Sequence, residues 1–331
     1  MGAKKSDPTR WGVSALQLQR PEHVFFEGDV RPWDEALLHV STEAVVRGLN
    51  VFEGLKGYWQ GQGAGDRAFG WRSLPRHWER MRRSARLLQI PVDLDYEAFR
   101  DACEALTRAE LRPDRDLYIR ATLFVIEGHY GEGTTADLVL TAYKQDKEPP
   151  APIDVGVSTW RRAPDVSMPA RIKTSSNYQI ARLARLEGRS RGYEDMILLN
   201  QAGRVAEGLG ACVLMVRDGR LHSPPAYEGA LESITLEIVE ELAATMGIDV
   251  VRRPIERSEL LIANELGLTG TLSEITLVRS VDETALPADA PILSELARRY
   301  RQAARGVEPH PAVDVQHVSL EQPAGAARRT A

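Results

Sequence analysis

Hydrophobic and polar positions alternate along the first half of the chain in a way that predicts strands and helices in turn. The run HVFFEGDVRPW, with its turn at residues 27–29, predicts a β-hairpin. LKGYWQ and RAFGW, on either side of the glycine-rich run GQGAG, predict a second one. Helical spacing of apolar residues covers residues 75–89 and then runs from Asp95, a residue type suited to an N-cap, to Leu111. Two apolar β-rich runs, DLYIRATLFVI and ADLVLTAYK, close this half.

The second half of the chain predicts more strands than helices. Its strand-like runs are IDVGVSTW, DMILLN, RVAEG, ACVLMV, RLHSPP and IDVVRRP. The four runs from DMILLN to RLHSPP are expected to form a meander with glycines at its turns. Helices are expected over residues 177–191 and 234–246. Periodicity is lost over roughly the last 30 residues, and PAGAARRTA is expected to be a frayed tail.

The length of the chain indicates two domains. Its 331 residues are about twice the roughly 150 residues typical of one domain. A polar, proline-rich run, KQDKEPPAP, is typical of a connection between domains. We therefore expect a small N-terminal α/β domain over residues 1–146, a linker over 147–154 and a larger, strand-rich C-terminal domain over 155–331.

Composition excludes several classes of protein. With 43% hydrophobic and 27% charged residues, the chain has ordinary globular usage rather than that of disordered, collagen-like or coiled-coil proteins. A net charge of -5 offers no electrostatic footprint for nucleic acid or an anionic membrane. The first residues, MGAKKSDPTRWG, contain no apolar region and no run of about 18 apolar residues occurs, so we expect neither secretion nor a membrane span. Cys103 and Cys212 lack metal-ligand spacing, so we expect a cytoplasmic protein with buried thiols and no metal.

Lysine is rare in this chain. Of the 42 basic residues, 36 are arginine, and the six lysines are Lys4, Lys5, Lys56, Lys144, Lys147 and Lys173. An amine can lose its proton and attack a carbonyl to form a Schiff base, whereas a guanidinium stays charged and cannot. Lys173 is the one lysine after residue 148, which makes it a candidate for covalent chemistry.

A cofactor site can be assembled around Lys173. Pyridoxal phosphate needs a lysine, a carboxylate facing its ring nitrogen, and a helix N-terminus or other donors for its phosphate. Glu207 lies between apolar neighbours, where a buried carboxylate requires a cationic partner, and Ser233 opens a predicted helix. The spacing alone equally fits a surface lysine, an edge-exposed carboxylate and an ordinary N-cap.

Longer stretches of the chain resemble a known family. The segment KTSSNYQIARLARLEGRSRGYEDMILLNQAGRVAEGLGA, followed by DGRLHSPP, ALESIT and ELGLTGTLSEITLVRSVD, closely resembles the class IV, or fold-type IV, pyridoxal-phosphate aminotransferases. Within that group the chain is most similar to the branched-chain amino-acid aminotransferases. The match extends back through NVFEGLKGYW, HWERM and LYIRATLFV and covers roughly residues 25–282. The resemblance implies an α+β fold of two domains, like that of D-amino-acid aminotransferase.

The resemblance implies how individual residues hold the cofactor. Lys173 matches the family's Schiff-base lysine, whose freed amine carries the proton between Cα and C4′. Tyr178 matches the tyrosine that hydrogen-bonds the ring 3-oxygen, and Glu207 matches the carboxylate that pairs with the ring nitrogen. The residues expected to bind the phosphate are Arg80, Ile234, Thr235 and Thr271.

The resemblance also implies a substrate pocket. Tyr118 and Arg120 match the pair that receives substrate carboxylates in branched-chain enzymes, including the side-chain carboxylate of glutamate. The other expected contacts are the amides of Thr271 and Leu272 for the α-carboxylate, and Phe52 and Gly54 for the substrate side chain.

The chain departs from the family pattern in two places. Arg47 stands where the family's HYG-like motif has an aromatic residue before its glycine. The family's LPGITR is LESITL here, with Glu232, Ser233 and Leu236 in place of Pro, Gly and Arg. These changes bear on substrate preference more than on cofactor binding. Our hypothesis is that Arg47 shifts preference toward a more polar 2-oxo acid, and its alternative is an arginine that points to solvent.

The expected activity is ping-pong transamination through Lys173 between an L-amino acid, either L-glutamate or a branched-chain one, and a 2-oxo acid. The resemblance also implies a homodimer or higher homo-oligomer in which the partner subunit completes each pocket. Two alternatives share the fold, a D-amino-acid or (R)-amine transaminase and an aminodeoxychorismate-lyase-like enzyme. A non-catalytic binding protein is disfavoured because both Lys173 and Glu207 are present.

Overall fold

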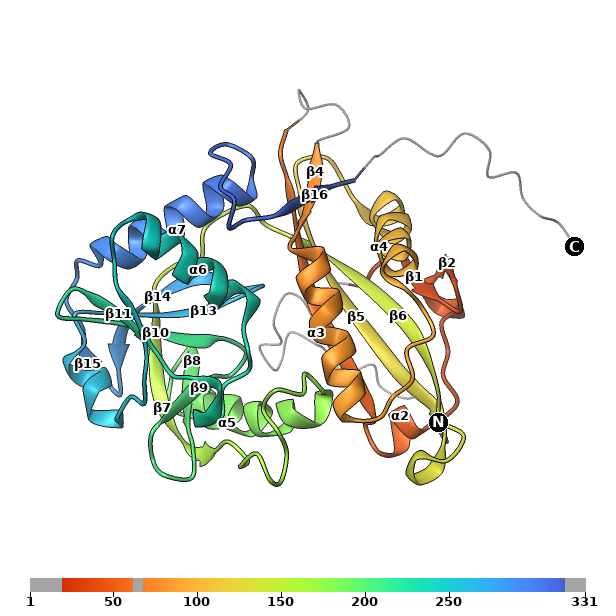
Figure 1. Cartoon of the computed structure of the whole chain (residues 1–331), viewed down its shortest axis with the longest axis horizontal. Helices are drawn as coiled ribbons and strands as arrows, with labels where there is room; N and C mark the ends of the chain where they lie inside the picture. Colours follow the sequence, from red (N-terminus) through yellow and green to blue (C-terminus); the bar gives the residue numbers. More distant parts are fainter. Residues whose placement is uncertain (1–19, 62–67, 319–331) are drawn as a thin grey trace, which may run out of the picture.

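The computed structural model of the chain describes residues 20–61 and 68–318, and within them two β-sheets stand side by side, each covered by helices (Figure 1). Of the predicted GQGAG loop only Gly61 is among the described residues. The rest of that loop and the predicted tail PAGAARRTA lie outside them. No helix in the described ranges combines the length and the apolar character needed to cross a membrane.

The first sheet has seven strands in the order β16-β4-β3-β5-β6-β1-β2, and each neighbouring pair is antiparallel. Its strands are β1 (His23–Phe26), β2 (Asp29–Pro32), β3 (Asn50–Trp59), β4 (Phe69–Arg72), β5 (Asp116–Glu127), β6 (Thr135–Gln145) and β16 (Val315–His317). Both predicted hairpins are confirmed, because β1 pairs with β2 and β3 pairs with β4.

Two long helices cover one face of the first sheet (Figure 1). They are α3 (Leu74–Leu87) and α4 (Tyr96–Glu110), and shorter elements nearby are η2 (Trp33–Glu35), α2 (Glu43–Val46) and η4 (His129–Gly131). The prediction of Asp95 as N-cap is confirmed, because its side chain accepts a hydrogen bond from Ala98 N at 2.9 Å. The rings of Trp78 and Phe99 stack with their centroids 4.9 Å apart, which packs the two helices together in the core.

The second sheet has nine strands and is mixed. Eight of them follow the order β12-β11-β10-β13-β14-β7-β8-β9, and β15 pairs with β14. They are β7 (Ile153–Arg161), β8 (Asp195–Leu199), β9 (Val205–Gly208), β10 (Cys212–Arg217), β11 (Arg220–Ser223), β12 (Val250–Arg252), β13 (Glu265–Gly270), β14 (Glu274–Val281) and β15 (Thr284–Ala285). The pairs β7–β8, β7–β14 and β11–β12 are parallel.

The predicted meander is wrong in its middle. Strands β8 and β9 pair, and so do β10 and β11, but β10 pairs with β13 rather than with β9. The ladder joins Cys212 to Thr269 and Val216 to Glu265. A period-two pattern predicts a strand but not which strand it pairs with, and here β11, α6 and β12 lie between the two partners in the chain.

Helices pack on the second sheet as well. They are α5 (Gln179–Ser190), α6 (Ile234–Thr245) and α7 (Pro291–Ala304), with short turns at η5 (Ser175–Tyr178), η6 (Ala226–Glu228) and η7 (Arg257–Ile262). Ser233 caps α6, because its hydroxyl accepts a hydrogen bond from Leu236 N at 3.3 Å. The helix α7 was not among the predicted elements, although Leu293, Leu296 and Tyr300 are buried at helical spacing.

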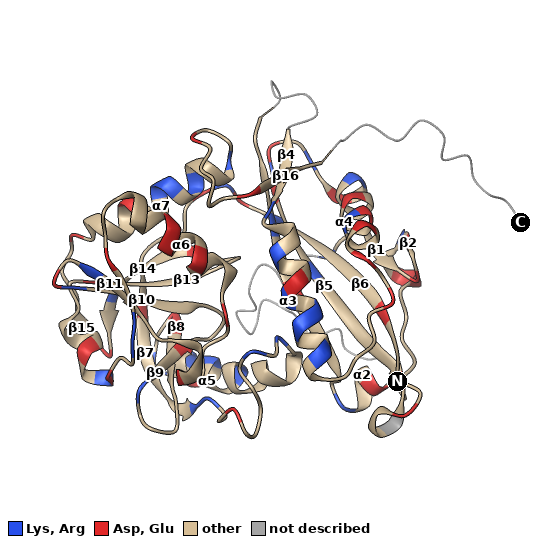
Figure 2. Ribbon diagram, in the orientation of Figure 1, with Lys and Arg blue, Asp and Glu red and all other residues tan. Residues whose placement is uncertain are grey.

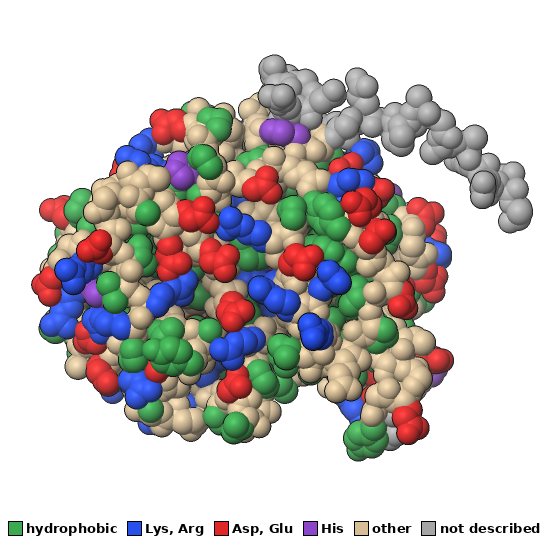
Figure 3. Space-filling view, in the orientation of Figure 1, with side chains coloured by type: hydrophobic (Ala, Val, Ile, Leu, Met, Phe, Trp, Pro, Cys, Tyr) green, Lys and Arg blue, Asp and Glu red, His purple; other side chains and the backbone are tan. Residues whose placement is uncertain are grey.

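Ion pairs between α3 and α6 link the parts of the chain that are built on the two sheets. Arg76 of α3 lies 3.8 Å from Glu237 and 3.3 Å from Glu241 of α6. In Figure 2 the ribbon of α6 carries acidic positions and that of α3 carries several basic ones. Over this face, charges of both signs are interspersed (Figure 3). The last described strand, β16, returns to the first sheet and pairs with β4, with Gln316 opposite Trp71. The domain boundary at residues 147–154 stays a prediction.

Candidate active site

Lys173 lies where β3 and α3 meet the start of the second half of the chain. Its main-chain N–H donates to Ser84 Oγ at 3.1 Å, and its carbonyl accepts from Phe52 N at 2.9 Å. Its Nζ lies 2.9 Å from the hydroxyl of Tyr178 and 4.9 Å from the centre of the Phe52 ring. These contacts fix the direction of the amine. Because the side chain is only half-buried, the amine is still open to a ligand.

A cavity opens around this amine. It is lined from α3, β9, β10, the N-terminus of α6 and the turn between β13 and β14, as well as from the segment that carries the lysine. Of the residues expected from the sequence, Arg80, Lys173, Tyr178, Glu207 and Thr271 line this one cavity. A lysine, a carboxylate and a helix N-terminus are therefore gathered in one place.

Glu207 reaches the cavity from the edge strand β9. Its side chain is 12% exposed, and its Oε1 lies 3.1 Å from Arg162 Nε. Its Oε2 accepts a hydrogen bond from Leu231 N at 2.9 Å. The carboxylate is thus nearly buried and held through both oxygens, in agreement with the expectation that a carboxylate here requires a cation.

Arg162 was not identified from the sequence. It is buried, and its Nη1 donates to the carbonyl of Asn177 at 3.0 Å while its Nε lies 3.3 Å from the carbonyl of Gly229. The apolar neighbours of Glu207 indicate that a cation is present, but Arg162 is one of many arginines and lies in an irregular segment far away in the chain. Only the folded structure identifies it as the partner.

Arg80 is fixed by a buried carboxylate on β3. Its Nε and Nη2 each donate to an oxygen of Glu53 at 2.7 Å, and its Nη1 donates to the carbonyl of Glu232 at 2.9 Å. His77 Nδ1 lies 2.8 Å from the same Glu53 carboxylate. This bidentate geometry directs one edge of the guanidinium toward the residue that precedes the α6 cap.

Burial and charge set the ionisation of this cluster. Burial alone would raise the pKa of the Glu53 carboxyl, but the Arg80 guanidinium outweighs it and lowers the value to about 2. For His77, burial lowers the pKa to about 4, even though the Glu53 carboxylate acts in the opposite direction. At neutral pH the cluster is therefore a Glu53–Arg80 ion pair with a neutral histidine beside it.

The N-terminus of α6 closes one side of the cavity. Ser233 lines the cavity, and Ile234 and Thr235 are buried as the first two residues of the helix. The first main-chain N–H groups of a helix lack helical acceptors and favour an anion. With the Arg80 guanidinium beside Glu232, this end of the cavity is built for a negative group.

The expected substrate residues share one face of the first sheet. Gly54 on β3 lies opposite Arg120 on β5, and Tyr118 lies opposite Lys56. A Cβ atom at Gly54 would come within 2.4 Å of the Tyr118 hydroxyl, so only glycine fits there. Burial raises the pKa of Tyr118 to about 12, which keeps its phenol protonated and able to donate a hydrogen bond.

Arg120 connects this face to the lysine. Its guanidinium lies 3.8 Å from the centre of the Phe52 ring, and its Nη2 donates to Ser175 Oγ at 3.1 Å. The Phe52 ring meets the Tyr178 ring edge-on, with centroids 5.0 Å apart. Phe52 therefore lies between a cation suited to a carboxylate and the tyrosine that contacts Lys173.

Two predicted substrate residues lie at the margin. Leu272 is 42% exposed in the β13–β14 turn, next to Thr271. Arg47 does not line the cavity of its own chain; its Nη1 donates to both oxygens of Glu43, at 2.7 and 2.8 Å, and its guanidinium lies 5.5 Å from the centre of the Tyr130 ring. Its role in substrate choice stays a prediction.

Known proteins share this arrangement of sequence and fold. The family described as "Amino-transferase class IV" matches residues 50–281. The "Branched-chain-amino-acid aminotransferase" of Escherichia coli strain K12 is 32% identical over 276 residues, which cover 81% of this chain and 87% of that protein.

Solved structures of branched-chain aminotransferases have a similar fold. The branched-chain aminotransferase of the thermophilic archaeon Thermoproteus uzoniensis, solved with norvaline, has a TM-score of 0.83 and 30% identity, covering 89% of this chain and 99% of that one. The T.th. branched-chain amino acid aminotransferase, solved in complex with N-(5'-phosphopyridoxyl)-L-glutamate, has a TM-score of 0.79 and 25% identity, covering 88% of this chain and 96% of that one.

The buried histidine makes stability depend on pH. Because the pKa of His77 falls from its ordinary 6.5 to about 4 on folding, the unfolded chain takes up a proton first as the pH drops. The contribution of neutral His77 to the free energy of unfolding is complete above pH 6.5, and it decreases by about 3 kcal/mol as the pH falls toward 4. Urea unfolding across this range measures it, with His77→Gln as the reference. An equal pH dependence in that variant would contradict the assignment.

The ion pair between Arg162 and Glu207 is expected to appear in a double-mutant cycle. Arg162→Gln leaves a buried carboxylate without its cation and is expected to cost about 3 kcal/mol of unfolding free energy. Adding Glu207→Gln removes the charge and is expected to restore at least half of the loss. The neighbouring Arg161 is exposed and donates to the carbonyl of Gln201, so Arg161→Gln serves as control. Additive losses in the double variant would exclude a direct pairing.

Proposed function

The chain belongs to the class IV aminotransferases, and we propose how its own residues carry out the transamination that this family performs. It is an enzyme that transfers an amino group between an amino acid and a 2-oxo acid with pyridoxal phosphate as cofactor. The predicted family and the α+β fold of type IV are confirmed. The lyase and the D-amino-acid or (R)-amine alternatives are not favoured, because the matched relatives named above are branched-chain aminotransferases.

One observation carries the assignment of the site. Lys173 and the buried, ion-paired carboxylate of Glu207 line the same cavity, and that cavity ends at the N-terminus of α6. An amine, an acceptor for a ring N–H and an anion site are the three groups that pyridoxal phosphate requires. When bound, the cofactor withdraws electrons from the substrate Cα and stores the amino group between the two half-reactions.

Each residue has a separate task in holding the cofactor. Lys173 would bind the aldehyde end, Tyr178 would donate to the ring 3-oxygen, and Glu207 would accept from the ring nitrogen. Arg162 holds the Glu207 carboxylate in place, so that it would face the ring nitrogen. The phosphate is held by Arg80, the amides of Ile234 and Thr235, and Thr271.

Lys173 also moves the proton. With the substrate amine in its place, the free amine of Lys173 would carry the proton between the substrate Cα and C4′ of the cofactor. The hydrogen bond to the Tyr178 hydroxyl and the Phe52 ring leave the amine little freedom to turn away. The Phe52 ring also covers the amine on one side and excludes water from it.

The substrate binds against the first sheet. Tyr118 and Arg120 receive a carboxylate, and the absence of a side chain at Gly54 lets the Tyr118 ring lie directly against β3. The amides of Thr271 and Leu272 bind the α-carboxylate, and Phe52 borders the side-chain pocket. We propose L-glutamate as donor, in line with the glutamate adduct bound by the T.th. relative.

We propose a homodimer as the functional unit. Large apolar side chains are exposed around α2 and η4, namely Leu37, Val40, Val45, Val46 and Tyr130. Exposed apolar residues gathered in this way favour an interface. Arg47 lies among these residues, and we propose that dimerisation brings it to the pocket of the partner subunit. A reducing compartment such as the cytoplasm is proposed from the two free, buried cysteines, Cys103 and Cys212.

The first half-reaction can be observed on its own. Adding L-glutamate without any 2-oxo acid to the protein loaded with pyridoxal phosphate is expected to bleach the visible absorption band and to release an equimolar amount of 2-oxoglutarate. Lys173→Ala is expected to give neither change within the same time, because no other amine lines the cavity among the described residues. D-glutamate is the stereochemical control. Bleaching by D-glutamate but not by L-glutamate would refute the proposal that L-glutamate is the donor.

The departure at Arg47 has a test of its own. If Arg47 reaches the partner's pocket, Arg47→Tyr is expected to change the ratio of kcat/KM for a branched-chain 2-oxo acid to that for a dicarboxylic one by about tenfold in favour of the branched-chain acid. Glu43→Gln releases Arg47 from its ion pair and controls for a merely local effect on α2. An unchanged ratio in Arg47→Tyr would mean that this arginine only faces solvent.

A further inference from the structure

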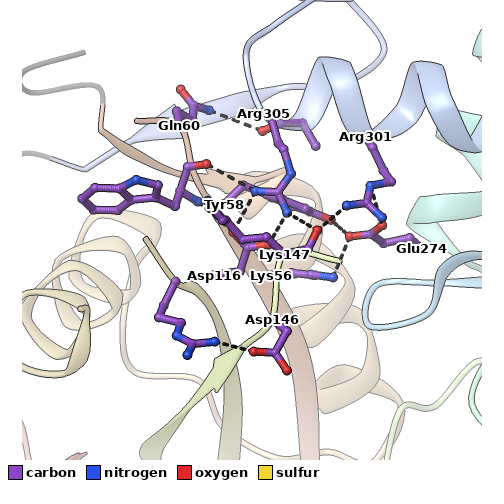
Figure 4. A network of polar contacts seen from close by, with 12 residues as sticks. Lys56, Tyr58, Gln60, Asp116, Asp146, Lys147, Glu274, Arg301 and Arg305 are labelled. Carbon is purple, nitrogen blue, oxygen red and sulfur yellow. Dashed lines mark hydrogen bonds and ion pairs between the residues drawn. The ribbon is translucent and has the colours of Figure 1, made fainter. Parts of the chain in front are cut away.

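One of the rare lysines has no task in the chemistry described so far. The side chain of Lys56 on β3 is 8% exposed, and Lys56 is the one lysine buried within the described residues. Its Nζ lies 2.6 Å from Glu274 Oε1, and the hydroxyl of Tyr58 donates to the same oxygen at 3.0 Å (Figure 4). A buried ion pair adds little net stability over apolar residues of similar size, so its presence calls for another reason.

Glu274 stands at the end of the turn between β13 and β14. It is the first residue of β14 and lies opposite Gly270, the last residue of β13. Its φ of 51° is in the left-handed region, which a residue with a side chain adopts only at a cost. Thr269 Oγ1 donates to its carbonyl at 2.7 Å. Burial alone would raise the pKa of the Glu274 carboxyl, but the Lys56 ammonium lowers it below its ordinary value.

The ion pair joins two parts of the site that come from different sheets. The turn that Glu274 closes carries Thr271, which lines the cavity. On β3, Lys56 shares a face with Phe52 and Gly54, because side chains of a strand alternate with period two. The 2.6 Å contact therefore connects the proposed carboxylate-binding turn to the strand that borders the substrate side chain.

Further charges support the pair from the other side. Arg301 of α7 has its Nε 3.8 Å from Glu274 Oε2 and donates to the carbonyl of Lys147 (Figure 4). Arg305, one turn further along α7, bonds both oxygens of Asp116 on β5, at 3.0 and 2.6 Å, and reaches the same Lys147 carbonyl at 3.2 Å. The network thus spans both sheets, α7 and the segment that links them.

We propose that Lys56 and Glu274 are positioning residues that hold the β13–β14 turn against the substrate face of β3. They set the distance between the amides that bind the α-carboxylate and the pocket that takes the substrate side chain. Neither residue touches the reacting atoms. This inference rests on the proposed function, since the role of the turn amides in substrate binding is part of it.

The test uses substitutions that remove or keep the charge. Lys56→Met retains the length of the side chain without the ammonium, and Lys56→Arg retains the cation. Lys147→Met is the matched control, because the Lys147 ammonium pairs with the exposed carboxylate of Asp114 and only its main chain joins the network. Steady-state kinetics with L-glutamate as donor separate KM from kcat.

Loss of positioning is expected to weaken substrate binding more than turnover. For Lys56→Met we expect KM for the donor to rise about tenfold while kcat changes by no more than about threefold. Lys56→Arg is expected to restore KM to within about threefold of the parent, and Lys147→Met to leave both constants unchanged. A loss of folded protein alone would lower apparent kcat and leave KM as it is, and that result would overturn the proposal.

A second measurement needs neither cofactor nor substrate. Amide hydrogen exchange of the peptide that spans Gly270–Glu274 is expected to be about tenfold faster in Lys56→Met than in the parent, and unchanged in Lys147→Met. Unchanged exchange in Lys56→Met would overturn the proposal even if L-glutamate were a good donor. Conversely, a parent enzyme that turns over no L-amino acid would refute the proposed donor, while faster exchange would still support the link between the turn and β3.

Discussion

Burying a carboxylate costs several kcal/mol unless a cation stands beside it, and three glutamates in and around the cavity meet this requirement in the same way. The pairs are Glu53 with Arg80, Glu207 with Arg162 and Glu274 with Lys56. In each pair the two partners come from segments that are far apart in the chain, so their attraction also fixes the distance between those segments. The cavity has its shape because three ion pairs, rather than apolar contacts alone, set the positions of its walls.

This arrangement separates the side chains that line the cavity from the side chains that orient them. Arg80 can point one edge of its guanidinium at α6 because Glu53 occupies two of its nitrogens. Glu207 is held through both oxygens by Arg162 and the amide of Leu231. The orienting residues are as buried as a hydrophobic core, which keeps water from competing for the same hydrogen bonds.

Local patterns in the sequence predict the helices and the hairpins but not the pairing of strands that are far apart in the chain. The N-cap at Asp95 depends on residues three apart, and the sequence is enough to predict it. The pairing of β10 with β13 depends on segments more than 40 residues apart, and periodicity has no information about it. Lys173 and Glu207 were identified because a rare lysine and an apolar environment are visible locally, whereas many arginines could have been the partner of Glu207. Resemblance to the family supplied the roles of Arg80 and Tyr178, which no single pattern in this chain would have given.

The main-chain hydrogen bonds of Lys173 have a consequence for how the chain can be divided. The lysine follows the segment that links the sheets, yet its N–H is bonded to Ser84 and its carbonyl to Phe52, both from before that segment. A polypeptide cut near residue 150 would leave the reactive amine on one fragment and the groups that aim it on the other. Neither fragment could then form the site alone, and the site would form only when the two fragments associate. Because of the hydrogen bonds of Lys173, the enzyme cannot be divided into two independent halves at the proline-rich segment where its sequence suggests a domain boundary.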